Sequence, residues 1–291
     1  MDKADLEVVL FDSLDLQDWI KIVSGVYERH CGGMGAHEAL MDFDASMEVG
    51  NIKPTHLVTL ACLIQYLDNL ETQVSISRGN QKVFDYIYNE LGFHEYWGGG
   101  KNHVEPLTST NVFNLWRIVE SEKDMYAKNV ENYFRRIYFH DRDLSSVSVS
   151  LVEAYYNVFD HANADGNAFS ILQYDEISGR LHVAISDFGI GIVQSVRDFD
   201  GNVGSDSDAI LKAIEDNFTV GSTGRNKGMG LGNILAPTDE ALLVSHCGWV
   251  TINRGMAQGA DYDFWYPGTL VCFDIDLSVM EKEEFLEEFS L

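Results

Sequence analysis

Three side chains that could do chemistry stand at regular spacing in residues 150–163. Glu153, Asn157 and His161 are four residues apart, a spacing that places an acid, an amide and an imidazole along one stripe of a helix. A carboxylate can accept a proton from a nucleophile, and an amide oxygen is a hard ligand suited to Mg²⁺. The same spacing is also typical of a solvated face on an amphipathic helix, so the stripe alone leaves both interpretations open.

A second group of such residues follows a predicted strand at 181–186. Asp187, Gly189 and Gly191 form the pattern Asp-x-Gly-x-Gly. A carboxylate at a strand end can accept a hydrogen bond from an exocyclic amine, and glycines let the backbone approach a flat base closely. Many hairpin turns carry the same pattern, so an ordinary turn is the alternative.

A second glycine cluster comes about forty residues later and begins a helical pattern. It consists of Gly228, Gly230, Leu231 and Gly232. Glycines at a helix start expose backbone N–H groups to an anion, and the helix dipole favours negative charge there. Arg225 and Lys227 stand just before the cluster, where they could contact phosphates or belong to a solvated loop. Residues 197–223, rich in Gly, Asp and Ser, have the composition of a mobile lid.

Other phosphate-binding patterns are absent from the sequence. No Walker A motif is present, and the second glycine cluster does not follow a strand with the spacing of a dinucleotide fingerprint. Any nucleotide site would therefore have to be built from the helix stripe and the two glycine clusters.

The elements that must position these residues alternate in type. In the first hundred residues we predict strands at 6–11, 39–44 and 73–77, and helices at 16–30, 55–70 and 81–91. This alternation predicts a small α/β sandwich with its own core. Because three glycines at 98–100 mark the clearest break, we expect a first domain at 1–98, a linker at 99–109, a second domain at 110–280 and an acidic tail at 281–291.

The second domain is predicted to begin with helices and to continue with strands. Helices are expected at 111–119 and 125–138, strands at 168–174, 180–186 and 267–277, and a helical stretch at 209–217. The whole chain is thus expected to be of the α/β (α+β) class. The aromatic stretch at 249–266 could belong to the core or form a partner surface.

The order of motifs in residues 110–277 resembles the GHKL superfamily, the ATP-binding fold of histidine kinases, anti-sigma serine kinases and type II topoisomerases. The resemblance implies a Bergerat-fold sandwich, with a mixed sheet and helices on one face, that binds Mg·ATP. Glu153 would be the base that positions water or an acceptor hydroxyl, Asn157 would hold Mg²⁺, and His161 would line the phosphate end. Asp187 would bind the adenine amine. The remaining nucleotide-binding residues would be Gly189, Gly191, Arg225, Lys227, Gly228, Gly230, Leu231 and Gly232.

The first hundred residues resemble a STAS-like domain in the order of their elements, from the strand at 39–45 to the helix that ends near residue 93. The resemblance implies an interaction or sensing module for a protein partner. The phosphoacceptor of that family lies in an Asp-Ser-Ser-Gly-like turn before the helix at 55–70. Here that turn offers only the hydroxyl of Thr55, without the acid or the glycine, so Thr55 is interpreted as a helix-starting residue.

Composition excludes several classes of partner. The net charge of −26 argues against nucleic acid or an anionic membrane surface, since both require a basic footprint. Four cysteines are scattered without metal or redox spacing, which fits reduced thiols. The most apolar run, residues 57–67, is too short to span a bilayer. We therefore expect a cytoplasmic protein.

These observations predict a cytosolic ATP-binding signalling regulator that binds and slowly hydrolyses Mg·ATP. One alternative is an anti-sigma-type serine/threonine kinase that acts on a STAS-like partner or on its own first domain. Another is a binding module in which ATP only sets the conformation. An autophosphorylating histidine kinase is disfavoured because His140 and Asp141 lie at the end of a predicted helix and not within a dimerising helical hairpin.

Overall fold

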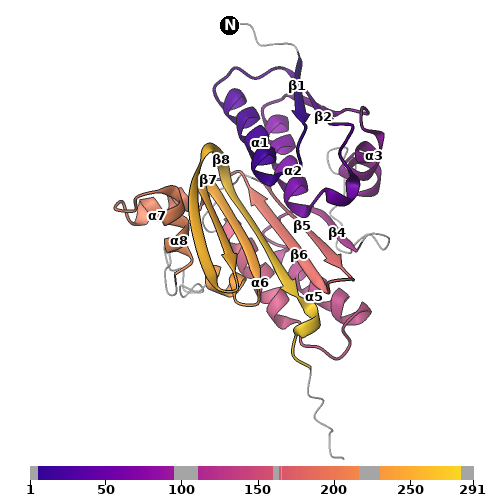
Figure 1. Cartoon of the computed structure of the whole chain (residues 1–291), viewed down its shortest axis with the longest axis vertical. Coiled ribbons are helices and arrows are strands. Elements are labelled where there is room, and N and C mark those ends of the chain that lie inside the picture. Colours follow the sequence, from indigo (N-terminus) through magenta and orange to yellow (C-terminus); the bar gives the residue numbers. More distant parts are fainter. Residues whose placement is uncertain (1–5, 95–110, 160–163, 165, 216–229, 283–291) are drawn as a thin grey trace, which may run out of the picture.

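The computed structural model describes residues 6–94, 111–159, 164, 166–215 and 230–282 of the chain. These residues form two β-sheets with associated helices, which confirms the predicted α+β class. The first half of the chain lies beside the upper part of a larger sheet built by the second half (Figure 1).

The first sheet is parallel and has the strand order β1-β2-β3. Its strands and helices alternate along the chain as predicted, in the order β1 (Leu6–Phe11), α1 (Leu16–Cys31), β2 (Glu38–Phe43), α2 (Pro54–Asn69), β3 (Gln73–Ile76) and α3 (Gln81–Phe84). A 3₁₀ turn, η1 (Val49–Asn51), precedes α2, and a π-helical turn, η2 (Asp85–Glu90), extends α3.

Both long helices of the first half begin at residues suited to a helix start. The Asp15 carboxylate accepts the backbone N–H of Gln17 at 2.9 Å, so it caps the first turn of α1. Helix α2 begins with Pro54, whose missing N–H would have no helical partner at this position.

The second sheet has five strands in the order β4-β5-β6-β8-β7. They are β4 (Val112–Arg117), β5 (Ala168–Asp175), β6 (Arg180–Asp187), β8 (Met256–Asp276) and β7 (Glu240–Asn253). Every neighbouring pair is antiparallel, so the expectation of a mixed sheet is wrong for the described residues. Arg254 and Gly255 both have positive φ and join the two longest strands in a tight hairpin.

The predicted helix at 111–119 is strand β4, and the reason lies in an irregularity of the strand. Its pairing with β5 shifts register between Phe113 and Trp116. Both of these side chains therefore face the helices, while Val112 and Leu115 face the opposite side. A bulge thus gives a strand the spacing of three that is otherwise typical of a helix.

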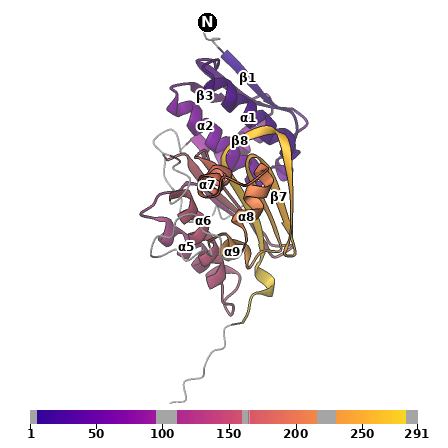
Figure 2. The same cartoon turned by 90° about the vertical axis from the view of Figure 1, so that its left-hand side faces the viewer.

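The helices of the second half cover one face of the five-stranded sheet. They are α5 (Lys123–Ile137), α6 (Ser145–Asn157), α7 (Gly191–Phe199), α8 (Asp206–Ala213) and α9 (Gly230–Leu235), followed by a short 3₁₀ turn, η4 (Leu277–Val279), after β8. Figure 2 shows α5, α6 and α9 grouped on one side of the sheet, and their buried side chains share a core with it. No helix in the described parts of the chain is both long and apolar enough to cross a lipid bilayer.

The opposite face of this sheet is covered by helices of the first half. Helix α2 packs on β5 and β6, and α1 packs on β8. One continuous apolar core therefore joins the first half to residues such as Phe169 and Ile171 of β5. This differs from the separate core that we expected for the first half.

The expected domain boundary, residues 99–109, lies outside the described residues. At the other end, Lys282 forms a β-bridge with Arg142, and its ammonium group pairs with Asp141 at 3.3 Å. The second half therefore continues to residue 282, two residues beyond the expected end.

Candidate functional site

Helix α6 carries two of the predicted site residues. The hydroxyl of Tyr155 lies 3.0 Å from that of Ser170, which fixes the helix on β5. Leu151 and Ala154 are buried toward the sheet, whereas Glu153 and Asn157 are half-buried and one turn apart. The carboxylate and the amide are thus side by side on α6, at the rim of the helical layer.

Asp187 is the last residue of β6 and faces the same layer. Leu181, Val183 and Ile185 of this strand contribute to the core beneath the helices, and side chains along a strand alternate between its faces. The carboxylate is almost completely buried and accepts the backbone N–H of Gly189 at 2.9 Å. A second backbone N–H, that of Thr269, also reaches it.

Burial raises the pKa of Asp187 to about 7, although both backbone N–H groups act in the opposite direction. Desolvation penalises the charged carboxylate more than two hydrogen bonds stabilise it. Near neutral pH the protonated and ionised forms of this group are therefore both populated, which is uncommon for an aspartate.

Two glycines make the close packing around the turn after β6 possible, and one of them, Gly268, packs directly against Asp187. Gly268 has φ +77°, and a Cβ on it would lie 2.2 Å from the Asp187 carbonyl oxygen and 2.6 Å from the Gly189 nitrogen. Gly191 has φ +81°, and a Cβ there would lie 2.5 Å from Ser245 Oγ. Because no side chain fits at either position, the turn after β6 requires both glycines.

Sequence reasoning missed the contribution of β8 to this region. Thr269 is in register with Asp187 across the β6–β8 pair, and its hydroxyl oxygen accepts the backbone N–H of Ile192 at 3.2 Å. By its sequence, Pro-Gly-Thr at 267–269 predicts only the beginning of a closing strand. A glycine inside an apolar strand is a sign of close backbone approach and could have identified Gly268.

The structure gathers some of the predicted residues and leaves others undescribed. Helix α9, which contains Gly230, Leu231 and Gly232, packs against α6, so the helix stripe and this part of the glycine cluster lie in one layer with Asp187. A Cβ on Gly232 would meet no atom within 4 Å, so that position is open. The other predicted site residues, His161, Arg225, Lys227 and Gly228, lie outside the described residues.

The described residues contain no cluster of three or more His, Cys, Asp or Glu side chains that could hold a metal ion. Asn157 can supply one oxygen ligand. A magnesium ion at this position would need its other oxygens from water or from a bound phosphate, which is how Mg²⁺ is commonly held.

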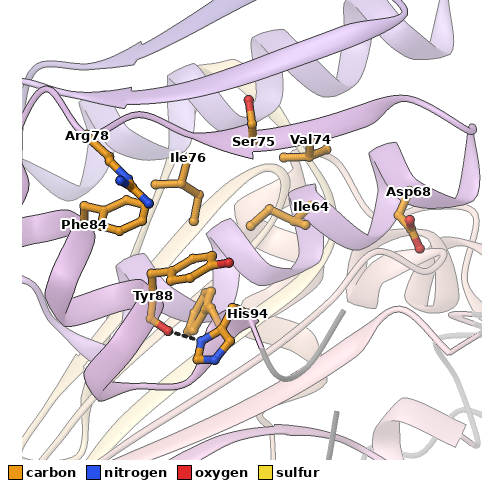
Figure 3. A pocket seen from close by; sticks show the side chains of 10 residues that line it. Ile64, Asp68, Val74, Ser75, Ile76, Arg78, Phe84, Tyr88 and His94 are labelled. Carbon is orange, nitrogen blue, oxygen red and sulfur yellow. Dashed lines mark hydrogen bonds between the residues drawn. The ribbon is translucent and has the colours of Figure 1, made fainter. Parts of the chain in front are cut away.

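A separate cavity of about 380 Å³ lies in the first half, beside β3 (Figure 3). The guanidinium carbon of Arg78 lies 5.0 Å from the centre of the Phe84 ring, and Tyr88 stacks between Phe84 and His94 at 4.9 and 4.6 Å. None of the predicted site residues lines this cavity, and no motif in the sequence indicates it. The lining residues are Ile64, Asp68, Val74, Ser75, Ile76, Arg78, Phe84, Tyr88, Phe93 and His94.

Thr55, the hydroxyl considered as a phosphoacceptor, lies in the first turn of α2. Its hydroxyl oxygen is buried and has no hydrogen-bond partner among the described residues. A kinase could not reach this oxygen without opening the start of the helix, which agrees with the interpretation of Thr55 as a structural residue.

Comparisons with known proteins do not add a relative. A scan against protein-family models and a search of curated proteins both return no match. The functional interpretation therefore depends on the residues themselves and on their arrangement.

Proposed function

We propose that this chain binds an adenine nucleotide in the helical layer of its second half, where Asp187 recognises the base. The observation that carries the proposal is the buried Asp187 carboxylate with backbone packed against it at Gly268 and Gly189. Two backbone N–H groups only partly offset the cost of burying this carboxylate, and an adenine amine is a further donor of the right kind. The resemblance of the motif order to the GHKL superfamily supports the same site.

The phosphate end of the nucleotide is assigned to α6 and α9. These helices pack against each other in the layer that Asp187 faces. In the proposal, Asn157 contributes an oxygen to Mg²⁺, while the backbone of Gly230 and Gly232 faces the phosphates. When bound, the metal ion would neutralise charge that develops on the phosphates.

Glu153 is assigned the chemical step. Its carboxylate is half-buried one turn before Asn157, where it can orient a water molecule and accept its proton. The proposed activity is slow hydrolysis of Mg·ATP by a signalling regulator whose first half receives a protein partner. The burial of the Thr55 hydroxyl speaks against phosphorylation of the chain's own first half at this residue.

Calorimetry with purified full-length protein tests nucleotide binding. At pH 8, above the pKa of about 7 for Asp187, ATP is expected to bind about ten- to a hundredfold more tightly than GTP, because the 6-oxo group of guanine would face the ionised Asp187 carboxylate with two acceptors, at a cost of roughly 1–3 kcal/mol. Equal affinities for the two nucleotides would remove Asp187 from the proposal.

The same samples, incubated with labelled ATP, test the chemistry. Wild type should release phosphate, while Glu153→Gln should lose about 10²- to 10⁴-fold in rate and keep its ATP affinity within a few-fold. Label transferred to protein would instead indicate a kinase. If ATP binds but neither free phosphate nor labelled protein forms, the chain is a module that binds ATP without turning it over.

A further inference from the structure

The residue that follows Asp187 points away from the proposed nucleotide site. Phe188 faces the helices of the first half, where its ring centre lies 5.5 Å from that of Tyr27 on α1 and 6.2 Å from that of Tyr66 on α2. Since Asp187 faces the opposite side of the sheet, two neighbouring residues connect the proposed site with the first half.

The two tyrosines belong to a longer row of ring contacts. Their ring centres are 4.3 Å apart, and Tyr27 also lies 5.8 Å from Trp265 of β8. Trp265 stacks on His246 at 4.8 Å, and the His246 ring nitrogen Nε2 lies 3.2 Å from the carbonyl oxygen of Ile190. The row thus starts at Phe188 and returns to the chain at Ile190, so both sides of the intervening Gly189 are held.

The backbone before the turn is held by the same helix α2. The thiol of Cys62 donates to the carbonyl oxygen of Ser186 at 3.3 Å, and the Cys62 carbonyl oxygen accepts the side-chain amide of Asn167 at 3.0 Å. The carbonyl oxygen of Asn167 in turn accepts the backbone N–H of Phe188 at 3.0 Å. Residues on both sides of Asp187 are therefore tied to α2, directly or through one intermediate residue.

We propose that Tyr27 and Tyr66 are positioning residues, which clamp Phe188 and so hold the Asp187 turn in the geometry that binds the adenine base. This inference rests on the proposed function for its consequence on affinity, although the clamp itself is independent of any ligand. A displacement of α1 or α2 would move Phe188 and with it Asp187. The first half is thus the element through which a partner could change nucleotide affinity.

A base-end clamp makes a specific prediction for binding. Tyr66→Leu in the full chain should weaken ATP and ADP by the same factor, roughly three- to thirtyfold, because one or two aromatic contacts are lost. The loss should be the same in Mg²⁺ and in EDTA, since the phosphate end is untouched. Tyr66→Phe, which keeps the ring, should retain the wild-type affinity. Combined with Asp187→Asn, the effect of Tyr66→Leu should largely disappear.

Tyr86→Leu is the matched control. Tyr86 is buried in the same core cluster, in η2, and is not part of the row from Phe188 to Ile190. The Tyr86→Leu substitution should lower the thermal midpoint of unfolding without changing nucleotide affinity. If Tyr66→Leu behaves like this control, the tyrosines only pack the core and the clamp is wrong.

Hydrogen exchange without nucleotide separates failure of the clamp from failure of the proposed function. Amides of residues 186–192 should exchange at least several-fold faster in Tyr66→Leu than in Tyr86→Leu, compared at equal global stability. Equal exchange in this segment would overturn the clamp even if ATP binds. Faster exchange in a protein that binds no adenine nucleotide would keep the clamp and reject the proposed function.

Discussion

The two sheets of this protein differ in how many of their faces are covered. The parallel sheet of the first half has a face on which Leu6, Val8 and Leu10 of β1 remain 51%, 55% and 46% exposed. The antiparallel sheet of the second half is covered on both faces, by α5–α9 on one side and by α1 and α2 on the other, except at the exposed outer end of the β7–β8 hairpin. Helices α1 and α2 therefore pack on two sheets at once, and the two halves share one apolar core.

The largest effect should come from truncating a residue on the shared face. Ile171 is fully buried in the core cluster that joins the halves, so Ile171→Ala should lower the free energy of unfolding by about 2–5 kcal/mol. Urea unfolding followed by hydrogen exchange should show both halves losing protection in one transition.

Leu172→Ala is the control for this experiment, because Leu172 is equally buried on the opposite face of the same strand. Both variants should keep a single transition. If instead two unfolding transitions appeared, and only the transition of the second half moved to lower urea concentration, the halves would be stable independently. That result would contradict the shared core.

A smaller effect concerns the pH dependence of stability, in which the buried ionisable groups of the two halves differ. Burial lowers the pKa of His56 on α2 to about 4 and raises the pKa of Asp187 to about 7. Neutral His56 stabilises the fold above pH 6.5, and this contribution is lost as pH falls toward 4. For Asp187 the pH dependence is opposite, because its protonated form stabilises the fold. This contribution to stability is complete below pH 3.8 and is lost as pH rises through 7.

Asp187→Asn isolates the second of these contributions, since an asparagine can still accept the Gly189 N–H. Between pH 5 and pH 8, wild type should lose roughly 2–3 kcal/mol of stability relative to the variant. Because His56 is present in both proteins, its contribution cancels in the difference. Parallel pH profiles from chemical unfolding would show that Asp187 titrates normally.

The smallest effects on stability are expected when the same substitution, Val→Thr, is made on each of the two sheets. Val183 of β6 is 2% exposed, so Val183→Thr should cost about 1–3 kcal/mol by burying a hydroxyl. Val8→Thr, on the open face of β1, should stay within about 0.5 kcal/mol. Thermal unfolding of both variants measures the difference directly. A substantial loss at Val8 would mean that a partner or a second copy covers this face in solution.

Local sequence patterns predicted most elements because their signals are local. The alternation in β1 and β2, the capping Asp15 and the apolar stripe of α2 all reflect contacts within a few residues. The prediction was wrong for β4, because the bulge in this strand gives its buried residues the spacing that is typical of a helix. Strand β7 was not predicted, since it is buried on both faces and so shows no clean alternation.

The candidate site was predictable only in part for a related reason. Asp187 could be placed at a strand end from its own neighbourhood, and Glu153 and Asn157 from their helical spacing. Gly268, whose backbone packs against Asp187, stands about eighty residues later, and Tyr66 about one hundred and twenty residues earlier. Contacts across such separations leave no periodic signal, so the sequence could mark Gly268 as a place of close backbone approach but could not show that it packs against Asp187, or that Tyr66 packs against Phe188.

The shared core also determines the order in which the chain can fold during synthesis. Cys62 meets Ser186 across 124 residues, and Gln17 of α1 meets Tyr262 across 245. Helices α1 and α2 therefore leave the ribosome long before the strands that cover them, and their apolar surface stays open until β8 has been made. Final folding of the first half waits until β8 has been made, and a chain that stalls or stops before β8 presents this surface to chaperones and to other nascent chains.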